Sequence, residues 1–139
     1  MQVRPTSVSD LDEISVPGGN VIKLYSSSSH PSRGVREIYI SDVHSNTVKA
    51  WKCHLRRECH LIVLTGRVGF VMLERDRFRS VILESNKPQM LTINKGVWFG
   101  FKGLSPKSSK ILNYMFDPFS DLEYEKRPLE YFDYDWRVL

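Results

Sequence analysis

The chain has 139 residues and a mass of 16.2 kDa, which is the size of a single domain. Hydrophobic residues make up 41% and charged residues 26%, a globular balance that excludes a disordered chain. The longest aliphatic run, residues 61–64, is far too short to cross a membrane, and the N-terminal residues lack the apolar stretch of a secretory signal. Two cysteines, Cys53 and Cys59, cannot form a disulfide framework, and they favour the reducing cytoplasm.

The net charge of +4 is unevenly distributed along the chain. Residues 111–139 carry seven acidic and three basic side chains, which leaves a net charge of +8 on the first 110 residues. A basic body with an acidic tail suits an anionic ligand, above all a phosphate, and also a tail that docks on its own body. Nucleic-acid binding ranks last among the functions considered, because the chain has no recognisable nucleic-acid module and no regular aromatic-basic pattern.

Apolar and polar residues alternate with period two along most of the chain, and helical periodicity is nearly missing. A turn signal at residues 17–20 precedes the first predicted strand, and the serine-rich segment 26–34 after that strand predicts a loop. The predicted strands are 21–25, 35–43, 48–55, 60–64, 67–73, 78–83, 89–93, 97–101 and 110–116. These short strands, without crossover helices between them, predict an all-β antiparallel sandwich or barrel.

The two ends of the chain differ from this regular pattern. We expect a single domain, residues 1–139, with an N-terminal arm over residues 1–19. Residues 117–139 are rich in acidic and aromatic side chains and are too apolar for a solvated extension. This tail is expected to pack on the barrel or on a second subunit.

The segment 48–60, which runs on to Gly66, holds most of the reactive side chains. On a regular strand residues 50, 52 and 54 share one face, and residues 49, 51 and 53 share the other. The segment resembles the first motif of the cupin superfamily, whose small jelly-roll barrels carry two inward histidines, then a carboxylate, then a glycine. His54 stands at the second histidine, Lys52 at the first, Cys59 at the carboxylate and Gly66 at the glycine.

A second segment, residues 93–101, resembles the second cupin motif and keeps its glycine, while Phe99 stands where a histidine is usual. A catalytic metal needs about three or four convergent histidine and carboxylate ligands. The motif positions supply His54, with Cys59 as a possible thiolate, and the ammonium of Lys52 would repel a cation. The sequence therefore predicts a site without a metal and without another cofactor.

The chain is most similar to two groups of cupins that modify nucleotide-linked keto-sugars, the dTDP-4-dehydrorhamnose 3,5-epimerases and the dTDP-sugar 3,4-ketoisomerases. Residues 49–54 with Gly66 resemble the Arg-Gly-aromatic-His-Ala-His block of the ketoisomerases and its later glycine. Residues 94–105 and 134–136 resemble epimerase segments. The resemblance implies a cupin-type antiparallel jelly-roll barrel, a homodimer, and a nucleoside-diphosphate sugar as ligand, with neither nucleic acid nor membrane as a partner.

The resemblance also implies an activity, the metal-independent epimerisation or keto-isomerisation of a nucleoside-diphosphate 4-keto-sugar in the biosynthesis of a surface polysaccharide. His54 would be the general base, since histidine titrates near neutral pH. Lys52 would stabilise an enolate or bind a phosphate, and Tyr114 would be the acid. The alternative is a non-catalytic cupin that binds a sugar nucleotide or a glycan, or supports a partner enzyme, because residues 52, 59 and 113 depart from the catalytic residues of these families.

The resemblance further indicates ligand-binding positions. Lys49 stands where these families have an arginine that contacts phosphate, and a lysine acts there as a point charge. Cys59 and Asn113 stand at the epimerases' lysine and tyrosine, and Trp98 or Phe99 could stack on a base or a sugar ring.

Three expectations concern the direction of side chains around the first motif. The inward frame of the cupin strands predicts that Lys52, His54 and Cys59 line one cavity. Alternation away from Cys59 predicts that His60 faces outward. Arg57 lies at a predicted bend, where a solvent-facing side chain is expected.

Overall fold

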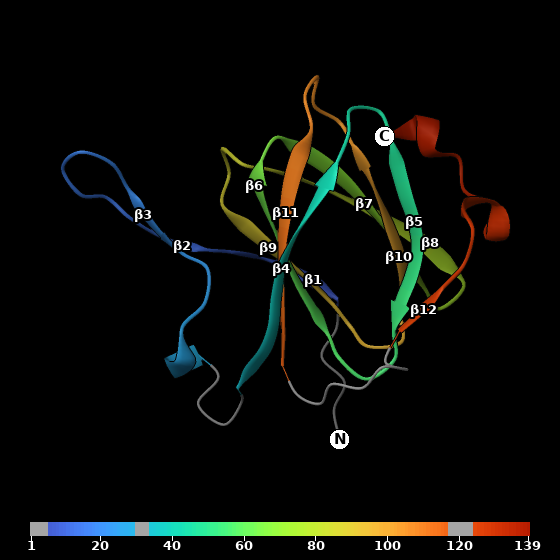
Figure 1. The fold of residues 1–139 in the computed structure, drawn as a ribbon, viewed down its shortest axis with the longest axis horizontal. Helices are drawn as coiled ribbons and strands as arrows, with labels where there is room; N and C mark the ends of the chain where they lie inside the picture. Colours follow the sequence, from blue (N-terminus) through green and yellow to red (C-terminus); the bar gives the residue numbers. More distant parts are fainter. Residues whose placement is uncertain (1–5, 30–33, 117–123) are drawn as a thin grey trace.

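The computed structural model describes residues 6–29, 34–116 and 124–139, and two five-stranded sheets enclose its interior (Figure 1). The first sheet has the order β1 (Ser7–Asp10), β9 (Gln89–Ile93), β6 (Cys59–Thr65), β11 (Ser109–Phe116) and β4 (Val35–Val43). The second has the order β12 (Tyr124–Lys126), β5 (Val48–His54), β10 (Trp98–Gly103), β7 (Arg67–Glu74) and β8 (Arg77–Glu84). All strand pairs within these two sheets are antiparallel, so the predicted all-β antiparallel barrel is confirmed.

A separate hairpin, β2 (Asp12–Ile14) with β3 (Val21–Lys23), projects away from the barrel (Figure 1). The helical elements are three short 3₁₀ turns, η1 (Ser27–Ser29), η2 (Leu129–Tyr131) and η3 (Trp136–Val138). Within the described residues, no helix has the length and apolar character needed to span a membrane.

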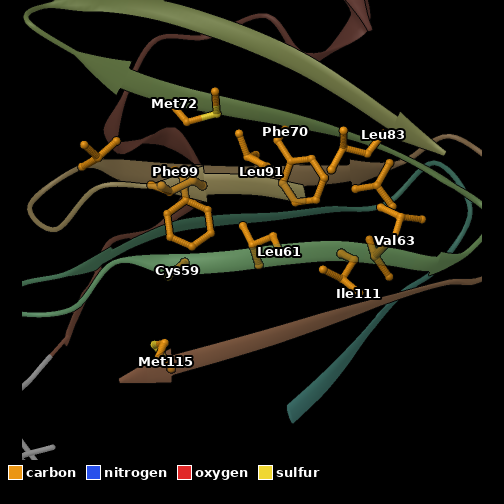
Figure 2. Packing of buried hydrophobic residues seen from close by; sticks show 14 residues of the cluster. Cys59, Leu61, Val63, Phe70, Met72, Leu83, Leu91, Phe99, Ile111 and Met115 are labelled. Atoms are coloured by element: carbon orange, nitrogen blue, oxygen red, sulfur yellow. The ribbon is translucent and has the colours of Figure 1, made fainter. Parts of the chain in front are cut away.

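The core lies between the two sheets, where inward residues of facing strands meet (Figure 2). Leu61 on β6 and Ile111 on β11 face Phe70 on β7 and Phe99 on β10. Each of these side chains is almost fully buried, and burial of one large apolar side chain stabilises a fold by about 1.5–3 kcal/mol. The core thus fixes the strands that carry the site.

The described part of the tail adds β12 to the edge of the second sheet, and residues 129–139 pack on the outer face of that sheet. The Trp51 ring lies 5.2 Å from Phe132 and 5.3 Å from Trp136, between ring centroids, and the Trp51 indole N–H donates to the Leu129 carbonyl over 3.0 Å. These contacts place an aromatic cluster outside the barrel. Residues 117–123 of the predicted tail lie outside the described residues.

A bulge in β5 changes the predicted alternation of its side chains. β10 pairs Phe99 with Lys52 but Gly100 with Ala50, so Trp51 has no partner on β10. A bulge adds one residue to a strand and thereby puts the residues on either side of it out of phase. Lys49 therefore faces the barrel interior together with Lys52, and the expectation that Lys49 and Trp51 share a face is wrong: Trp51 packs outside with the tail.

Candidate functional site

A cavity of about 310 Å³ lies between the two sheets, and its lining includes the edge strands β4 and β12 together with β5. Apolar side chains of β6, β10 and β11 form one part of its wall, and polar side chains form the other. Its described lining consists of Tyr39, Ser41, Lys49, Ala50, Trp51, Lys52, Leu61, Phe99, Phe101, Ile111, Asn113 and Lys126.

Three lysines make the cavity electropositive. Lys52 and Lys126 are direct cross-strand partners, and their Nζ atoms lie 4.5 and 5.6 Å from the centroid of the Tyr124 ring. Lys49 joins them from the other side of the bulge and donates from Nζ to the Asp42 carbonyl over 3.2 Å. No acidic side chain occurs in the described lining, so the field in the cavity favours an anionic ligand.

A phenol and an amide face the cavity from neighbouring strands. Tyr39 on β4 and Asn113 on β11 are cross-strand partners, and Asn113 Nδ2 donates to Tyr39 Oη over 3.0 Å. The pKa of Tyr39 is raised to about 12, mainly by burial; the Asn113 hydrogen bond opposes this rise, the charges of Cys59 and Glu37 add to it, and the charge of Arg57 opposes it. At neutral pH Tyr39 is therefore a protonated phenol that can donate a hydrogen bond or a proton to a ligand.

Four of the residues predicted from the sequence meet at this cavity: Lys49, Lys52, Phe99 and Asn113. They come from β5, β10 and β11, and the resemblance places the first two beside a phosphate or a keto-sugar. The structure brings them to one cavity from both sheets, as a ligand site requires.

Two further predicted residues point into the barrel without belonging to the described lining of the cavity. His54 lies two residues after Lys52 on the same face of β5, is only 3% exposed, and stacks on Phe99 with 6.3 Å between ring centroids. Cys59 is buried in the core and lies close enough to Tyr39 to affect the pKa of its phenol. Of the three residues expected to line one cavity, Lys52 does so, and His54 and Cys59 lie next to its lining.

The last two predicted residues, Trp98 and Tyr114, lie on the outer faces of the sheets. Trp98 packs against Phe132 of the tail, with 5.7 Å between ring centroids. Tyr114 stacks on the His60 ring at 4.6 Å, and its hydroxyl donates to Met90 Sδ over 3.3 Å. Because each residue is adjacent to an inward one, Trp98 to Phe99 on β10 and Tyr114 to Asn113 on β11, period two directs both away from the cavity.

Comparison with known proteins assigns the chain to a family. The sequence profile described as FdtA, WxcM-like, C-terminal matches residues 4–136. The chain belongs to this family. None of the curated proteins matches its sequence significantly.

Solved structures of sugar-nucleotide enzymes share the fold of this family member. A dTDP sugar isomerase from Desulfovibrio desulfuricans G20 is 26% identical and superposes with a TM-score of 0.81, over 93% of this chain and 87% of that one. The sugar 3,4-ketoisomerase QdtA from Thermoanaerobacterium thermosaccharolyticum, solved with TDP, is 15% identical, with a TM-score of 0.75 over 88% of each chain. The dTDP-4-dehydrorhamnose 3,5-epimerase from Bacillus anthracis, solved with TDP and PPi, is 14% identical, with a TM-score of 0.75 over 90% of this chain and 79% of that one. The cupin-type jelly roll is thus confirmed.

In this WxcM-like chain, sequence reasoning missed three polar residues of the cavity, Tyr39, Ser41 and Lys126, and misplaced another residue near it. Tyr39 lies on a predicted strand whose inward face was not specified, and Lys126 lies in the acidic tail, where nothing in the local sequence marks it. Arg57, expected to face solvent, is only 3% exposed, and its charge acts on Tyr39. His60 does lie on the outer face of its sheet, but it is buried there beneath Tyr114 and Phe116.

Proposed function

We propose that the protein is an isomerase that epimerises a nucleoside-diphosphate 4-keto-sugar or moves its keto group, without a metal. The observation that carries the proposal is the cavity itself, which combines three lysines with a protonated phenol over an apolar floor. The proposal extends to a role in surface-polysaccharide biosynthesis in the cytoplasm. Both cysteines are buried and outside a disulfide, which suits a reducing compartment.

The charges and the volume of the cavity suit this ligand class. The ammonium groups of Lys49, Lys52 and Lys126 would face the diphosphate, since lysine binds phosphate as a point charge. A volume of about 310 Å³ is at the lower end of the range for small-molecule sites, about 300–1,000 Å³, and suits a sugar ring better than a complete sugar nucleotide. The nucleoside would then extend beyond the cavity toward its open side.

The proposed chemistry is proton transfer next to a ketone. A base removes a proton from the carbon beside the keto group, and the electron pair of the C–H bond forms an enolate that takes the proton back on another face or carbon. His54 is the proposed base, reached when the ligand displaces the Phe99 side chain on which it stacks. Lys52 would stabilise the negative charge that develops on the keto oxygen. Tyr39, in place of Tyr114, would donate its hydroxyl proton to that oxygen.

The test is hydrogen exchange from heavy water. The purified protein is mixed with TDP-4-keto-6-deoxyglucose, a ligand solved with a mutant of the ketoisomerase QdtA, and incorporation of deuterium into the sugar is followed by mass spectrometry. His54→Asn should slow exchange by about 10²–10⁴-fold, the usual value of a positioned base, while binding is nearly retained. Lys107→Gln, an exposed lysine outside the described lining, is the matched control.

One observation favours a second function, a non-catalytic cupin that binds a sugar nucleotide or a glycan or supports a partner enzyme. The catalytic positions of the related enzymes carry Lys52, Cys59 and Asn113 here, and His54 stacks behind Phe99. Tight binding of the keto-sugar without exchange in the wild-type protein would select this function. Absence of binding would contradict both.

The proposal includes a homodimer, supported by apolar side chains at two separate places on the surface. Ile38 and Ile40 on the edge strand β4 are 60% and 54% exposed. The projecting β2–β3 hairpin exposes four more aliphatic side chains, Ile14, Val16, Val21 and Ile22. Large exposed apolar areas mark interfaces, and a two-fold axis would bury both places of each chain at once.

A further inference from the structure

The side chain of Asn113 joins two strands in the wall of the cavity. It is 1% exposed, and each end of its amide has a partner. Oδ1 accepts a hydrogen bond from the backbone N–H of His60 on β6 over 2.9 Å, and Nδ2 donates to Tyr39 Oη on β4 over 3.0 Å. The amide therefore lies between a fixed main-chain group and a phenol that faces the ligand space.

The partner at one end fixes the direction of the hydrogen bond at the other. A backbone N–H can only donate, so the atom of Asn113 that faces His60 must be the oxygen. The NH₂ group must then face Tyr39, and because this group has no acceptor, the phenol oxygen has to accept. The Tyr39 hydrogen cannot be directed at Asn113, and because Tyr39 lines the cavity, this hydrogen is available to a ligand there.

We propose that Asn113 is a positioning residue that directs the hydroxyl hydrogen of Tyr39 toward the ligand and stabilises the phenolate left after that proton has moved. The inference rests on the proposed function and adds to it the group that orients the acid. As the base removes the carbon-bound proton, the O–H bond of Tyr39 breaks and an O–H bond forms on the keto oxygen. The phenolate keeps the Asn113 N–H as donor, and the proton returns when the ketone is restored.

The other ionisable groups around Tyr39 act on its phenol through their charge. Cys59 and Glu37 raise the pKa of the phenol by their charge, and Arg57 lowers it. The Lys52 ammonium lies 5.9 Å from the centroid of the Tyr39 ring and can only donate. Asn113 is thus the group whose hydrogen bond opposes the effect of burial most strongly.

The direction of the bond is tested without any sugar. Fluorotyrosine, whose phenol is more acidic, is incorporated, the Tyr39 resonance is assigned with Tyr39→Phe, and its pKa is measured by ¹⁹F NMR in the wild type and in Asn113→Leu. Loss of a donor to the phenolate raises the pKa of Tyr39, whereas loss of an acceptor for the phenol hydrogen lowers it. A raised pKa is expected, and a lowered or unchanged pKa overturns the proposal.

Asn113→Asp tests the consequence for catalysis and keeps an oxygen for the His60 N–H. Above its pKa the introduced carboxyl can only accept, so it takes the Tyr39 hydrogen away from the ligand; once protonated, it can donate to Tyr39 as the amide does. At high pH the Asn113→Asp variant should exchange hydrogen about 10²-fold more slowly than the wild type. The ratio of the variant rate to the wild-type rate should rise as the pH falls. A ratio near unity, or one that does not depend on pH, contradicts the proposal.

The double variant Tyr39→Phe, Asn113→Asp separates positioning from a structural role. If Asn113 acts through Tyr39, Asn113→Asp should have almost no further effect on exchange once the phenol is absent. An undiminished effect in the Tyr39→Phe background would show that Asn113 acts independently, and the proposal would fail. Absence of exchange in the wild type would contradict the proposed function, while the phenol titration would still decide the direction of the bond.

Discussion

Lys52 on β5 and Lys126 on β12 are cross-strand partners, and both ammonium groups lie over one ring, that of Tyr124. Two like charges directly opposite each other on a pair of strands are mutually unfavourable. The ring faces provide part of the compensation, since a cation over an aromatic face is attracted by its quadrupole. A bound anion would provide the rest, and this relationship leads to the first prediction.

Removal of these charges should weaken binding of TDP. Lys52→Met should cost about 10- to 150-fold in affinity, since a hydrogen bond to a charged group contributes about 1.5–3 kcal/mol. Lys126→Gln should cost only about threefold because its side chain is exposed and screened by solvent. Calorimetry at low and high salt measures both, and the losses should shrink as salt rises. A Lys52→Met variant that binds as tightly as Lys107→Gln would contradict this assignment of the phosphate site.

The second prediction concerns stability at alkaline pH. Burial raises the pKa of Tyr39 and that of Tyr114 to about 12, above the value of about 10 expected in the unfolded chain. The neutral phenols therefore favour the folded state fully below about pH 10, and this stabilisation is lost as the pH rises from there through about 12. Urea unfolding across this window should show a steep fall in the free energy of unfolding.

In Tyr39→Phe the loss in free energy of unfolding between about pH 10 and 12 should be smaller than in the wild type, by no more than about 3 kcal/mol. Tyr131→Phe is the control, because the side chain of Tyr131 is 57% exposed. Equal slopes for the wild type and Tyr39→Phe would mean that the phenol titrates alike in the folded and unfolded chains.

The third prediction compares two glycines with positive φ. Gly66 at the β6–β7 turn has φ +86°, and a Cβ there would overlap the side chain of Ser109. Gly96 has φ +80°, but a Cβ there would meet no atom within 4 Å. Gly96→Ala should therefore cost only the backbone strain, about 1 kcal/mol, while Gly66→Ala should cost about 2–4 kcal/mol in the free energy of unfolding. Equal losses in chemical denaturation would exclude a steric role for Ser109.

The fourth prediction tests the homodimer. Ile40→Lys should convert the protein to a monomer in sedimentation velocity, because an ammonium group cannot be buried in an apolar interface without a partner. Ile82→Lys is the matched control, since Ile82 is 40% exposed but lies on β8 of the other sheet. A wild-type protein that sediments as a monomer at high concentration would contradict the dimer. If Ile40→Lys and Ile82→Lys dissociate the dimer equally, the placement of the interface at β4 is contradicted.

Local sequence patterns predict most of the strands and the fold class. Alternation and turn residues predicted the positions of nine strands, with the bounds of β4 and β9 as observed, because side-chain period and turn chemistry are local properties. It did not predict β1, β2 or β12, which have three or four residues each and are almost wholly exposed, so that no alternating pattern marks them.

The tertiary structure decided which faces and which residues form the site. On β4 the inward residues include Glu37, Tyr39 and Ser41, whereas Ile38 and Ile40 face outward, opposite to the usual rule, because the inward face borders a polar cavity. The bulge at Trp51 moved Lys49 to the side of Lys52, a change of phase that depends on pairing with β10. Strand pairing also brought Lys126 to Lys52 and Asn113 to Tyr39 across more than seventy residues. Local sequence cannot encode such contacts, because they exist only once distant strands share a sheet.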